Sequence, residues 1–119
     1  MEIIRVGVDL AKNVIRVHGV DERERQVWRK SLKRDSWLAE VQLCVPAGAE
    51  IGFEACSGAH HWGRELIARG YRVKLMAPQF VKPYVKSNKS DRNDAAAICE
   101  AMSRPSMRFV ALKTTEQQD

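Results

Sequence analysis

The sequence has few cysteines and no long apolar run. Its three cysteines, Cys44, Cys56 and Cys99, are an odd number and none forms a C-x-x-C pair, so the sequence supports neither a disulfide framework nor a zinc site. We expect buried free thiols, because cysteine is among the residues most often buried. The apolar runs are far too short to span a bilayer, which predicts that the chain has no membrane partner.

The N-terminus also lacks the features of a signal peptide. The first residues, MEIIRVGVDL, carry an acid at the second position and an arginine inside the apolar run. A signal peptide instead has a basic segment, an apolar segment and a small-residue cleavage site, in that order. We therefore expect a cytoplasmic protein.

The overall composition is that of one soluble globular domain. The 119 residues are 45% hydrophobic and 29% charged, which suffices for a single domain with a single core. The formal net charge is +5 at pH 7. A basic chain favours polyanionic partners such as nucleic acids, although charge alone is a weak indication.

The apolar periodicity changes near residue 35 from a strand pattern to an alternation of helices and strands. Strands are expected at residues 3–9, 14–20, 26–32, 50–55 and 71–77. Helices are expected at residues 35–45, 59–70, 78–85 and 90–103, with Ser90 as the cap of the last one. The first three strands form an antiparallel meander, and the later strand–helix–strand units imply parallel pairing with right-handed crossovers. The sequence thus predicts an α/β fold with a mixed five-stranded sheet, order 3-2-1-4-5, flanked by helices.

The last residues are harder to assign. The segment MRFVAL, after Pro105, fits either a strand or an extended exit, and residues 113–119 are polar. We expect one domain over residues 1–112, followed by a polar tail or linker.

Four carboxylates are expected to converge at one edge of this sheet. Asp9 closes the first strand and Glu54 closes the fourth, and the predicted order makes these two strands parallel neighbours. Asp91 and Asp94, three residues apart, would share one face of the last helix. Magnesium prefers carboxylate and water oxygens, and four carboxylates can hold two ions for phosphodiester cleavage or transfer. Each residue also has a structural alternative: an aspartate after a strand is commonly a turn residue, and Asp91 would favour a helix N-terminus in any case.

Basic residues surround the expected acidic site. Those that could neutralise nucleic-acid phosphates are Lys12, Lys82, Lys86, Lys89 and Arg92, with Phe80 and Tyr84 interleaved. Such a strip is typical of nucleic-acid binding. The alternative is a solvated basic loop.

The remaining aromatic and imidazole side chains favour structural roles. The three tryptophans, at positions 28, 37 and 62, are expected in the core or packed on the sheet rather than as base-stacking platforms. His18, His60 and His61 are expected to be surface or partly packed residues, with a three-histidine metal site as the alternative. Ser57 lacks the flanking glycines of a nucleophile elbow, which argues against a serine hydrolase.

Three motifs together resemble a known family. VGVDLAK at 6–12, FEACSGAHHW at 53–62 and KSDRNDA at 89–95 are similar, in order and spacing, to the N-terminal domain of the DEDD transposases of bacterial insertion sequences, relatives of the pilin-gene inversion recombinase. The resemblance covers most of the chain, and its specificity lies in the conjunction of the three motifs. It implies a RuvC-like, ribonuclease H-type fold.

The same resemblance implies a catalytic tetrad and a cofactor. Its acidic residues would be Asp9, Glu54, Asp91 and Asp94, all of them metal ligands, with Mg²⁺ or Mn²⁺ as the ion. The implied activity is that of a transposase or recombinase that cleaves and transfers DNA strands.

The resemblance further implies missing parts and additional partners. Family members carry a C-terminal transposase domain with a serine proposed as nucleophile, and some are guided by a structured RNA. Residues 113–119 would then be a linker to that domain, which no part of this sequence matches. We expect a homo-oligomer in the full-length protein, and we do not expect this chain to recombine DNA alone.

Two other functional classes are compatible with part of the sequence. The sugar-kinase and actin-like ATPases share the sheet topology, but Ala11 replaces the glycine of their phosphate turn and one small domain cannot form their two-lobed cleft. The other alternative is a non-catalytic nucleic-acid-binding or interaction domain with a ribonuclease H-like fold, whose carboxylates would hold a structural ion.

Overall fold

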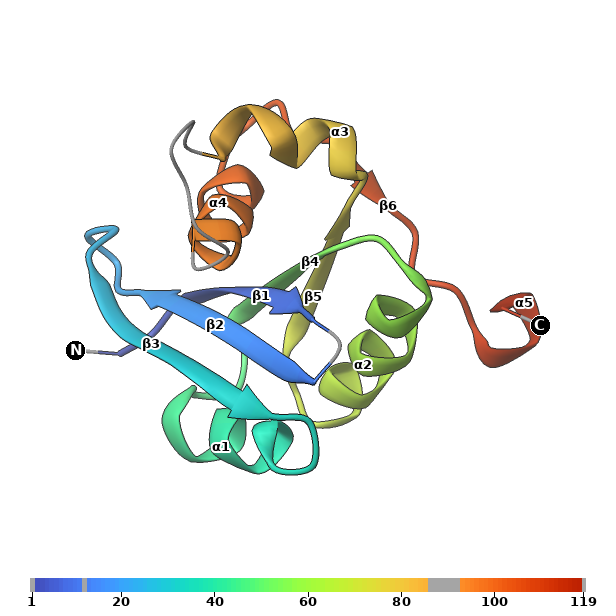
Figure 1. The fold of residues 1–119 in the computed structure, drawn as a ribbon, viewed down its shortest axis with the longest axis horizontal. Helices are drawn as coiled ribbons and strands as arrows, with labels where there is room; N and C mark the ends of the chain where they lie inside the picture. Colours follow the sequence, from blue (N-terminus) through green and yellow to red (C-terminus); the bar gives the residue numbers. More distant parts are fainter. Residues whose placement is uncertain (1, 12, 86–92, 119) are drawn as a thin grey trace.

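The computed structural model describes residues 2–11, 13–85 and 93–118, which form one mixed sheet with helices on both faces (Figure 1). The strands are β1 (Arg5–Leu10), β2 (Val14–Val20), β3 (Gln26–Lys33), β4 (Glu50–Glu54), β5 (Arg72–Met76) and β6 (Phe109–Val110). The helices are α1 (Trp37–Cys44), α2 (Ser57–Ala68), α3 (Pro78–Val81), the 3-10 turn η1 (Lys82–Tyr84), α4 (Asn93–Met102) and α5 (Thr115–Gln118).

The strand order is β3-β2-β1-β4-β5-β6. The first three strands pair antiparallel, β4 pairs parallel with both β1 and β5, and β6 pairs antiparallel with β5. The predicted order 3-2-1-4-5 is thus confirmed, and it is the order of a ribonuclease H-like, RuvC-like fold. The segment that could have been a strand or an extended exit supplies the sixth strand, over two residues.

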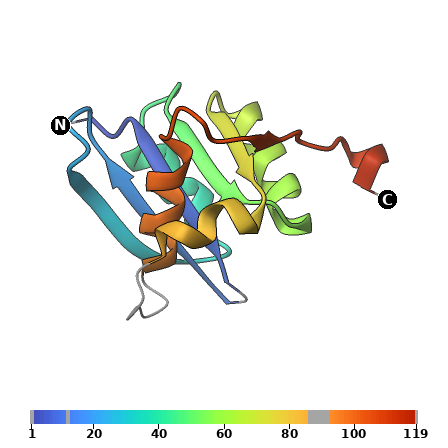
Figure 2. The ribbon, with the colours of Figure 1, turned by 90° about the horizontal axis from the view of Figure 1, so that it is seen from above.

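One face of the sheet is apolar and carries the main core. Strand residues such as Val8 and Phe53 belong to this core, and α1 and α2 cover this face of the sheet (Figure 2). Trp37 of α1 is fully buried, with its ring edge-to-face on Phe53 at 6.3 Å and on Trp62 at 5.3 Å between centroids. Such pairs add to the free energy of burial. Trp28 is also buried, so the structural interpretation of the tryptophans is confirmed.

The other face is covered by α4, which packs across β1, β2 and β4 (Figures 1 and 2). Two glycines permit this contact. A Cβ atom on Gly7 would lie 2.2 Å from the carbonyl oxygen of Ala95, and one on Gly52 would lie 2.5 Å from the sulfur of Met102. The Gly7 contact is with backbone atoms, so Gly7 fixes how closely α4 approaches the sheet. The Gly52 contact is with the end of a flexible side chain, which can move.

The helix predicted over 78–85 divides into α3 and η1. Pro78 occupies the first helical turn, where its missing N–H has no consequence. Pro83, however, lies where an α-helix would need a backbone donor. The chain therefore continues as a 3-10 turn after Val81. The helix predicted over 90–103 is α4, and its expected cap, Ser90, lies outside the described residues.

The segment after β6 lies against α2. The Lys113 N–H donates to Nδ1 of His60 at 3.0 Å, and Nη1 of Arg64 donates to the Lys113 carbonyl oxygen at 2.7 Å. Leu112 packs on the core close to Gly63. Side-chain contacts with α2 thus hold the extended exit in place.

The cysteine prediction is correct for only part of the set. Cys99 is buried in α4 and Cys44 is half-buried, but Cys56 is exposed. Cys56 is the residue that precedes α2, in the turn that leaves β4, and this turn faces solvent. Over the residues that the structure describes, no helix combines the length and the apolar character needed to cross a bilayer.

Candidate metal centre

Asp9 and Glu54 lie side by side at the end of the β1–β4 ladder. The last matched pair of that ladder is Val8 and Phe53, and the two carboxylates belong to the next residue on each strand. Neighbouring strands are about 4.8 Å apart. Both side chains are half-buried, and both line a cleft of about 260 Å³ beside Pro78.

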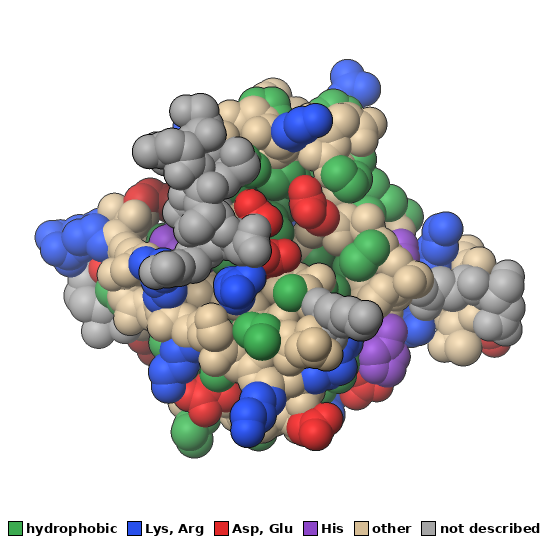
Figure 3. Space-filling view, viewed as in Figure 1, with side chains coloured by type: hydrophobic (Ala, Val, Ile, Leu, Met, Phe, Trp, Pro, Cys, Tyr) green, Lys and Arg blue, Asp and Glu red, His purple; other side chains and the backbone are tan. Residues whose placement is uncertain are grey.

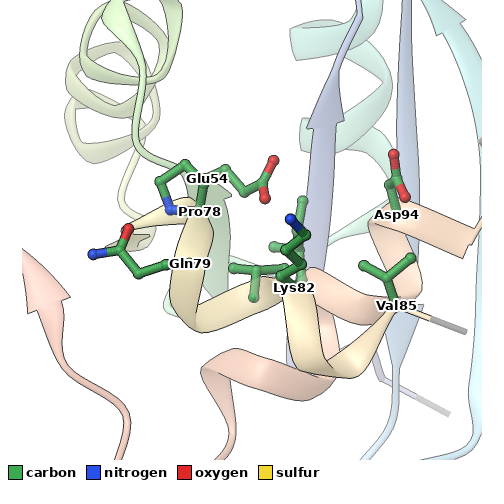
Figure 4. A pocket seen from close by; sticks show the side chains of 8 residues that line it. Glu54, Pro78, Gln79, Lys82, Val85 and Asp94 are labelled. Carbon is green, nitrogen blue, oxygen red and sulfur yellow. The ribbon is translucent and has the colours of Figure 1, made fainter.

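Asp94 reaches the same region from α4. It lies in the first turn of that helix and lines, together with Glu54 and Lys82, an adjoining cleft of about 570 Å³. In Figure 4 the carboxylates of Glu54 and Asp94 and the ammonium group of Lys82 all point into this space. Glu54 therefore lines both clefts, and Asp9, Glu54 and Asp94 form what we call the acidic cluster.

Burial and neighbouring negative charge both disfavour an ionised Glu54. Burial raises the pKa of the Glu54 carboxyl above its usual value of 4.5, and the negative charges of Asp94 and Asp9 raise it further. An ionised Glu54 is unfavourable here unless a cation is supplied.

The donor chemistry of the cluster suits a hard divalent cation, but its geometry is incomplete. Three carboxylates from three different elements provide the oxygen ligands that Mg²⁺ and Mn²⁺ prefer. Yet no three His, Cys, Asp or Glu side chains in residues 2–11, 13–85 and 93–118 converge closely enough to hold an ion together. The fourth predicted ligand, Asp91, lies outside the described residues.

Most of the predicted basic strip falls on parts of the chain that are not described. Lys12, Lys86, Lys89 and Arg92 are outside the described residues. Lys82 is exposed and begins η1, at the rim of the larger cleft. The Arg104 guanidinium lies 5.6 Å from the Tyr84 ring centroid, so this ring is occupied by a cation within the same fold.

The space-filling view shows acidic side chains in a hollow on one face of the molecule. Acidic side chains gather in the middle of the face seen in Figure 3, between the α3–α4 layer and the ends of the strands. Lys and Arg side chains flank the hollow on the side of β2 and β3. The site thus combines an acidic centre with a basic margin.

The histidines do not form a metal site. His18 belongs to β2 and faces α4, because it alternates with the core residues Ile15 and Val17, whereas His60 belongs to α2 on the opposite face of the sheet. His60 is buried rather than surface or partly packed, so that prediction is wrong for this residue. The reason is its contact with the chain after β6, which covers it.

Known proteins give an independent comparison. No protein-family model matches the chain. It is 51% identical over 121 residues to the "Probable family 20 transposase" of Pseudomonas aeruginosa, a match that covers 99% of this chain and 34% of that protein.

Two further relatives carry transposase names. The chain is 49% identical over 114 residues to the transposase for insertion sequence element IS1111A of Coxiella burnetii, with 96% of this chain and 31% of that protein covered. It is 43% identical over 113 residues to the transposase for insertion sequence element IS1328 of Yersinia enterocolitica, with 95% of this chain and 33% of that protein covered. The chain spans about a third of the length of these relatives.

Identity at this level over nearly the whole chain agrees with the three sequence motifs and with the observed strand order. The chain therefore belongs to the family of DEDD transposases of bacterial insertion sequences and corresponds to their RuvC-like domain.

Proposed function

We propose that this chain is the part of a DNA transposase that binds divalent metal ions for DNA strand cleavage and transfer. The ligands would be Asp9, Glu54, Asp91 and Asp94, and the ion Mg²⁺ or Mn²⁺. Family membership supports the class of reaction. The acidic cluster supports the position of the site.

The observation that carries the proposal is the unfavourable environment of Glu54. A half-buried carboxylate beside two others destabilises the fold when all three are ionised, as the raised pKa of Glu54 indicates. A carboxylate with a purely structural role would be paired with a cation or hydrogen-bonded to backbone donors. A divalent cation would relieve the repulsion among all three groups at once.

The residues around the cluster would bind and orient the DNA. When bound, divalent ions at such a site stabilise the attacking and leaving oxygens of a phosphodiester. Lys82 has its ammonium group at the rim of the larger cleft, where it would neutralise an adjacent phosphate of the substrate. The open side of the hollow would admit the strand.

The complete reaction would depend on more than this chain, which spans about a third of its relatives. We propose that the remaining part supplies a serine nucleophile and the contacts for oligomerisation, and that in some members of the family a structured RNA selects the DNA. On this proposal the chain alone binds metal and DNA but does not recombine DNA.

One observation favours the second candidate, a non-catalytic nucleic-acid-binding domain. In the described part of the chain, no group of three potential ligands is close enough to hold an ion. If Asp91 did not complete the site, the fold could bind nucleic acid without performing chemistry. The second candidate could hold a structural ion with the same carboxylates, so ion-dependent cutting of branched or single-stranded DNA, rather than metal binding alone, separates the two candidates.

Metal binding at the acidic cluster is tested by a comparison of thermal melts with and without Mg²⁺ or Mn²⁺ for the wild-type chain and for Asp9→Asn. An ion that binds only the native state stabilises it by about 2.7 kcal/mol at 100 times its dissociation constant. The wild-type chain should thus melt at a higher temperature with millimolar metal ion. Asp9→Asn should melt at or above the wild-type temperature without metal, and gain little when metal is added.

The matched control is Asp35→Asn, which alters an exposed aspartate in the turn before α1. This variant should respond to the ion as the wild-type chain does. If Asp9 serves only as a turn residue, Asp9→Asn will lose stability in metal-free buffer and keep the full response to the ion, and the metal-binding proposal is then wrong.

A further inference from the structure

A second basic surface lies on β2 and β3, away from the residues that the sequence pattern had indicated. In the β2–β3 ladder His18 is opposite Arg29, and Arg16 is opposite Ser31. Because paired residues share a face of the sheet, these four side chains lie on the face that α4 covers only in part. They line, with Ala95 of α4, a groove of about 240 Å³. We call this the basic groove.

The two faces of the β2–β3 hairpin differ in the ion pairs that the described residues form. In the described part of the chain no carboxylate forms an ion pair with Arg16 or Arg29. On the opposite face of the same hairpin, by contrast, Lys30 is paired with Glu40 at 2.8 Å. Burial and the positive charge of Arg29 lower the pKa of His18, so the groove disfavours one more positive charge.

The position of the basic groove relates it to the acidic cluster. Arg16 is the register partner of Asp9 across the β1–β2 ladder, which places their Cβ atoms about 5 Å apart. At the other wall of the groove, Ala95 directly follows Asp94 in α4. The basic groove therefore adjoins the acidic cluster, and both lie on the same face of the sheet.

The basic surface continues along β3 beyond the groove. Lys33 is exposed and lies opposite Val14 in the ladder, on the same face as Arg29. The two residues are four positions apart, a span of about 13 Å at 3.3 Å per residue. Duplex DNA presents about one phosphate charge per 1.7 Å of its axis, so both side chains could contact one duplex.

From this arrangement we infer that the basic groove binds the phosphodiester backbone of duplex DNA and leads it to the acidic cluster. The inference rests on the proposed function, which makes DNA the substrate. Charge complementarity selects the ligand. Guanidinium groups bind phosphate oxygens well, and those of Arg16 and Arg29 have no carboxylate partner within the described ranges. The adjoining carboxylates would repel the DNA backbone unless it were held from the side. Arg16 and Arg29 would act as positioning residues for the backbone.

The experiment measures binding of a fluorescein-labelled DNA duplex to the 119-residue chain in buffer with EDTA, from about 50 to about 200 mM salt. The variant is Arg29→Gln with Lys33→Gln, which removes two exposed cations. Each lost phosphate contact lowers the slope of log K against log salt by about 0.9. The double variant should therefore bind more weakly at low salt, with a slope smaller by about 1.8.

The matched control is Arg23→Gln with Arg108→Gln, which removes the same charge from two exposed arginines that do not line the groove. Its slope should equal that of the wild-type chain. Equal slopes for both double variants, or no binding of DNA by the wild-type chain, would overturn the inference. Tighter binding of an RNA duplex, with the same loss in the variant, would also reject DNA as the ligand.

The DNA-binding assay contains no free metal ion, so its result does not depend on whether the acidic cluster binds metal. If both double variants had the wild-type salt slope, the basic groove would be ruled out, but the thermal response to Mg²⁺ could still be present. Conversely, a chain that does not respond to metal could still show the change in slope.

Discussion

Asp9 and Glu54 each follow a glycine by two residues, and these glycines, Gly7 and Gly52, are register partners in the β1–β4 ladder. Side chains two positions apart point to the same face of a sheet. The two carboxylates therefore lie on the face where α4 approaches, and Gly7 provides the room for the backbone of that helix. The backbone contact that brings α4 close also brings Asp94 to the acidic cluster.

Gly7→Ala should destabilise the fold strongly. The added Cβ would lie 2.2 Å from a backbone oxygen of α4 and 2.5 Å from the backbone nitrogen of Cys99, and backbone atoms cannot move away without shifting the helix. Overpacking typically costs about 1 to 3 kcal/mol, so we expect a loss of about 3 kcal/mol or more. Urea denaturation measures it.

Gly58→Ala is the control for this prediction. Its Cβ would be 3.7 Å from the nearest atom, the Cδ1 of Leu10, which is an ordinary contact. In a helix, alanine is favoured over glycine by up to about 1 kcal/mol. The free energy of unfolding should stay equal or rise. A similar small effect for Gly7→Ala would show that α4 does not depend on close contact with β1.

Glu54→Gln should stabilise the metal-free chain at neutral pH. Because the pKa of Glu54 is raised in the fold, the folded state binds this proton more tightly than the unfolded state does. The wild-type chain therefore loses stability from this group as the pH rises above 4.5 through the folded pKa. The glutamine variant has no such loss.

The measurement is the melting temperature of both proteins across this pH window in EDTA. The advantage of the variant should grow with pH and level off once Glu54 is ionised. Glu22→Gln, an exposed carboxylate in the turn between β2 and β3, should show no such dependence. A constant difference between Glu54→Gln and the wild-type chain would contradict the electrostatic explanation.

His60 should make the fold sensitive to mild acid. Burial lowers the pKa of His60, with further lowering by the positive charges of Lys113 and Arg64, and protonation would also remove the acceptor for the Lys113 N–H. The stability contributed by neutral His60 is thus complete above its usual pKa of 6.5 and is lost as the pH falls through the lowered folded pKa.

Urea denaturation between about pH 8 and about pH 5 tests this. His60→Gln should lose less stability over that range than the wild-type chain, because glutamine does not titrate. His61→Gln, which alters the exposed neighbouring histidine, should behave as the wild-type chain. Identical pH dependence in all three proteins would assign the acid sensitivity to other groups.

The cysteines should differ sharply in their reactivity towards a thiol reagent. Cys56 is exposed, whereas burial raises the pKa of Cys99 to about 12. The thiolate is the reactive species, so only Cys56 should react rapidly in the native chain. Cys56→Ser should abolish the fast phase of labelling with a chromogenic disulfide. A fast phase that survives would mean that Cys44 or Cys99 becomes accessible in solution.

The sequence predicted the sheet because its apolar alternation is strong and its connections are short. The strand predicted over 14–20 has the observed bounds, and the strand ends at Asp9 and Glu54 were placed within one residue. Strand order followed from the handedness of crossovers, which needs no knowledge of side-chain packing. The proximity of Asp9 and Glu54 followed from that order.

Features that depend on tertiary contacts were not predictable in the same way. The burial of His60 depends on a chain segment some fifty positions later. The periodicity of apolar residues predicts helices and strands, but not which distant segment covers a given side chain. The basic groove was missed because Arg16 and Arg29 are separate in sequence and become neighbours only through the register of the hairpin. One signal was present: glycines inside strands, at positions 7 and 52, mark a close backbone approach.

Odd-numbered and even-numbered residues of β1 point to opposite faces of the sheet, so substitutions at them should affect different properties. In β1, Val6 and Val8 belong to the apolar core, and Gly7 and Asp9 belong to the face of the acidic cluster. A pooled variant library scored separately for protein abundance and for nucleic-acid binding should therefore separate Val6 and Val8 from Asp9. Gly7 is the exception, because its contact with the backbone of α4 makes it sensitive in abundance. Polar replacements at Val6 and Val8 would deplete abundance, whereas conservative replacements at Asp9 would spare it and alter only the functional score.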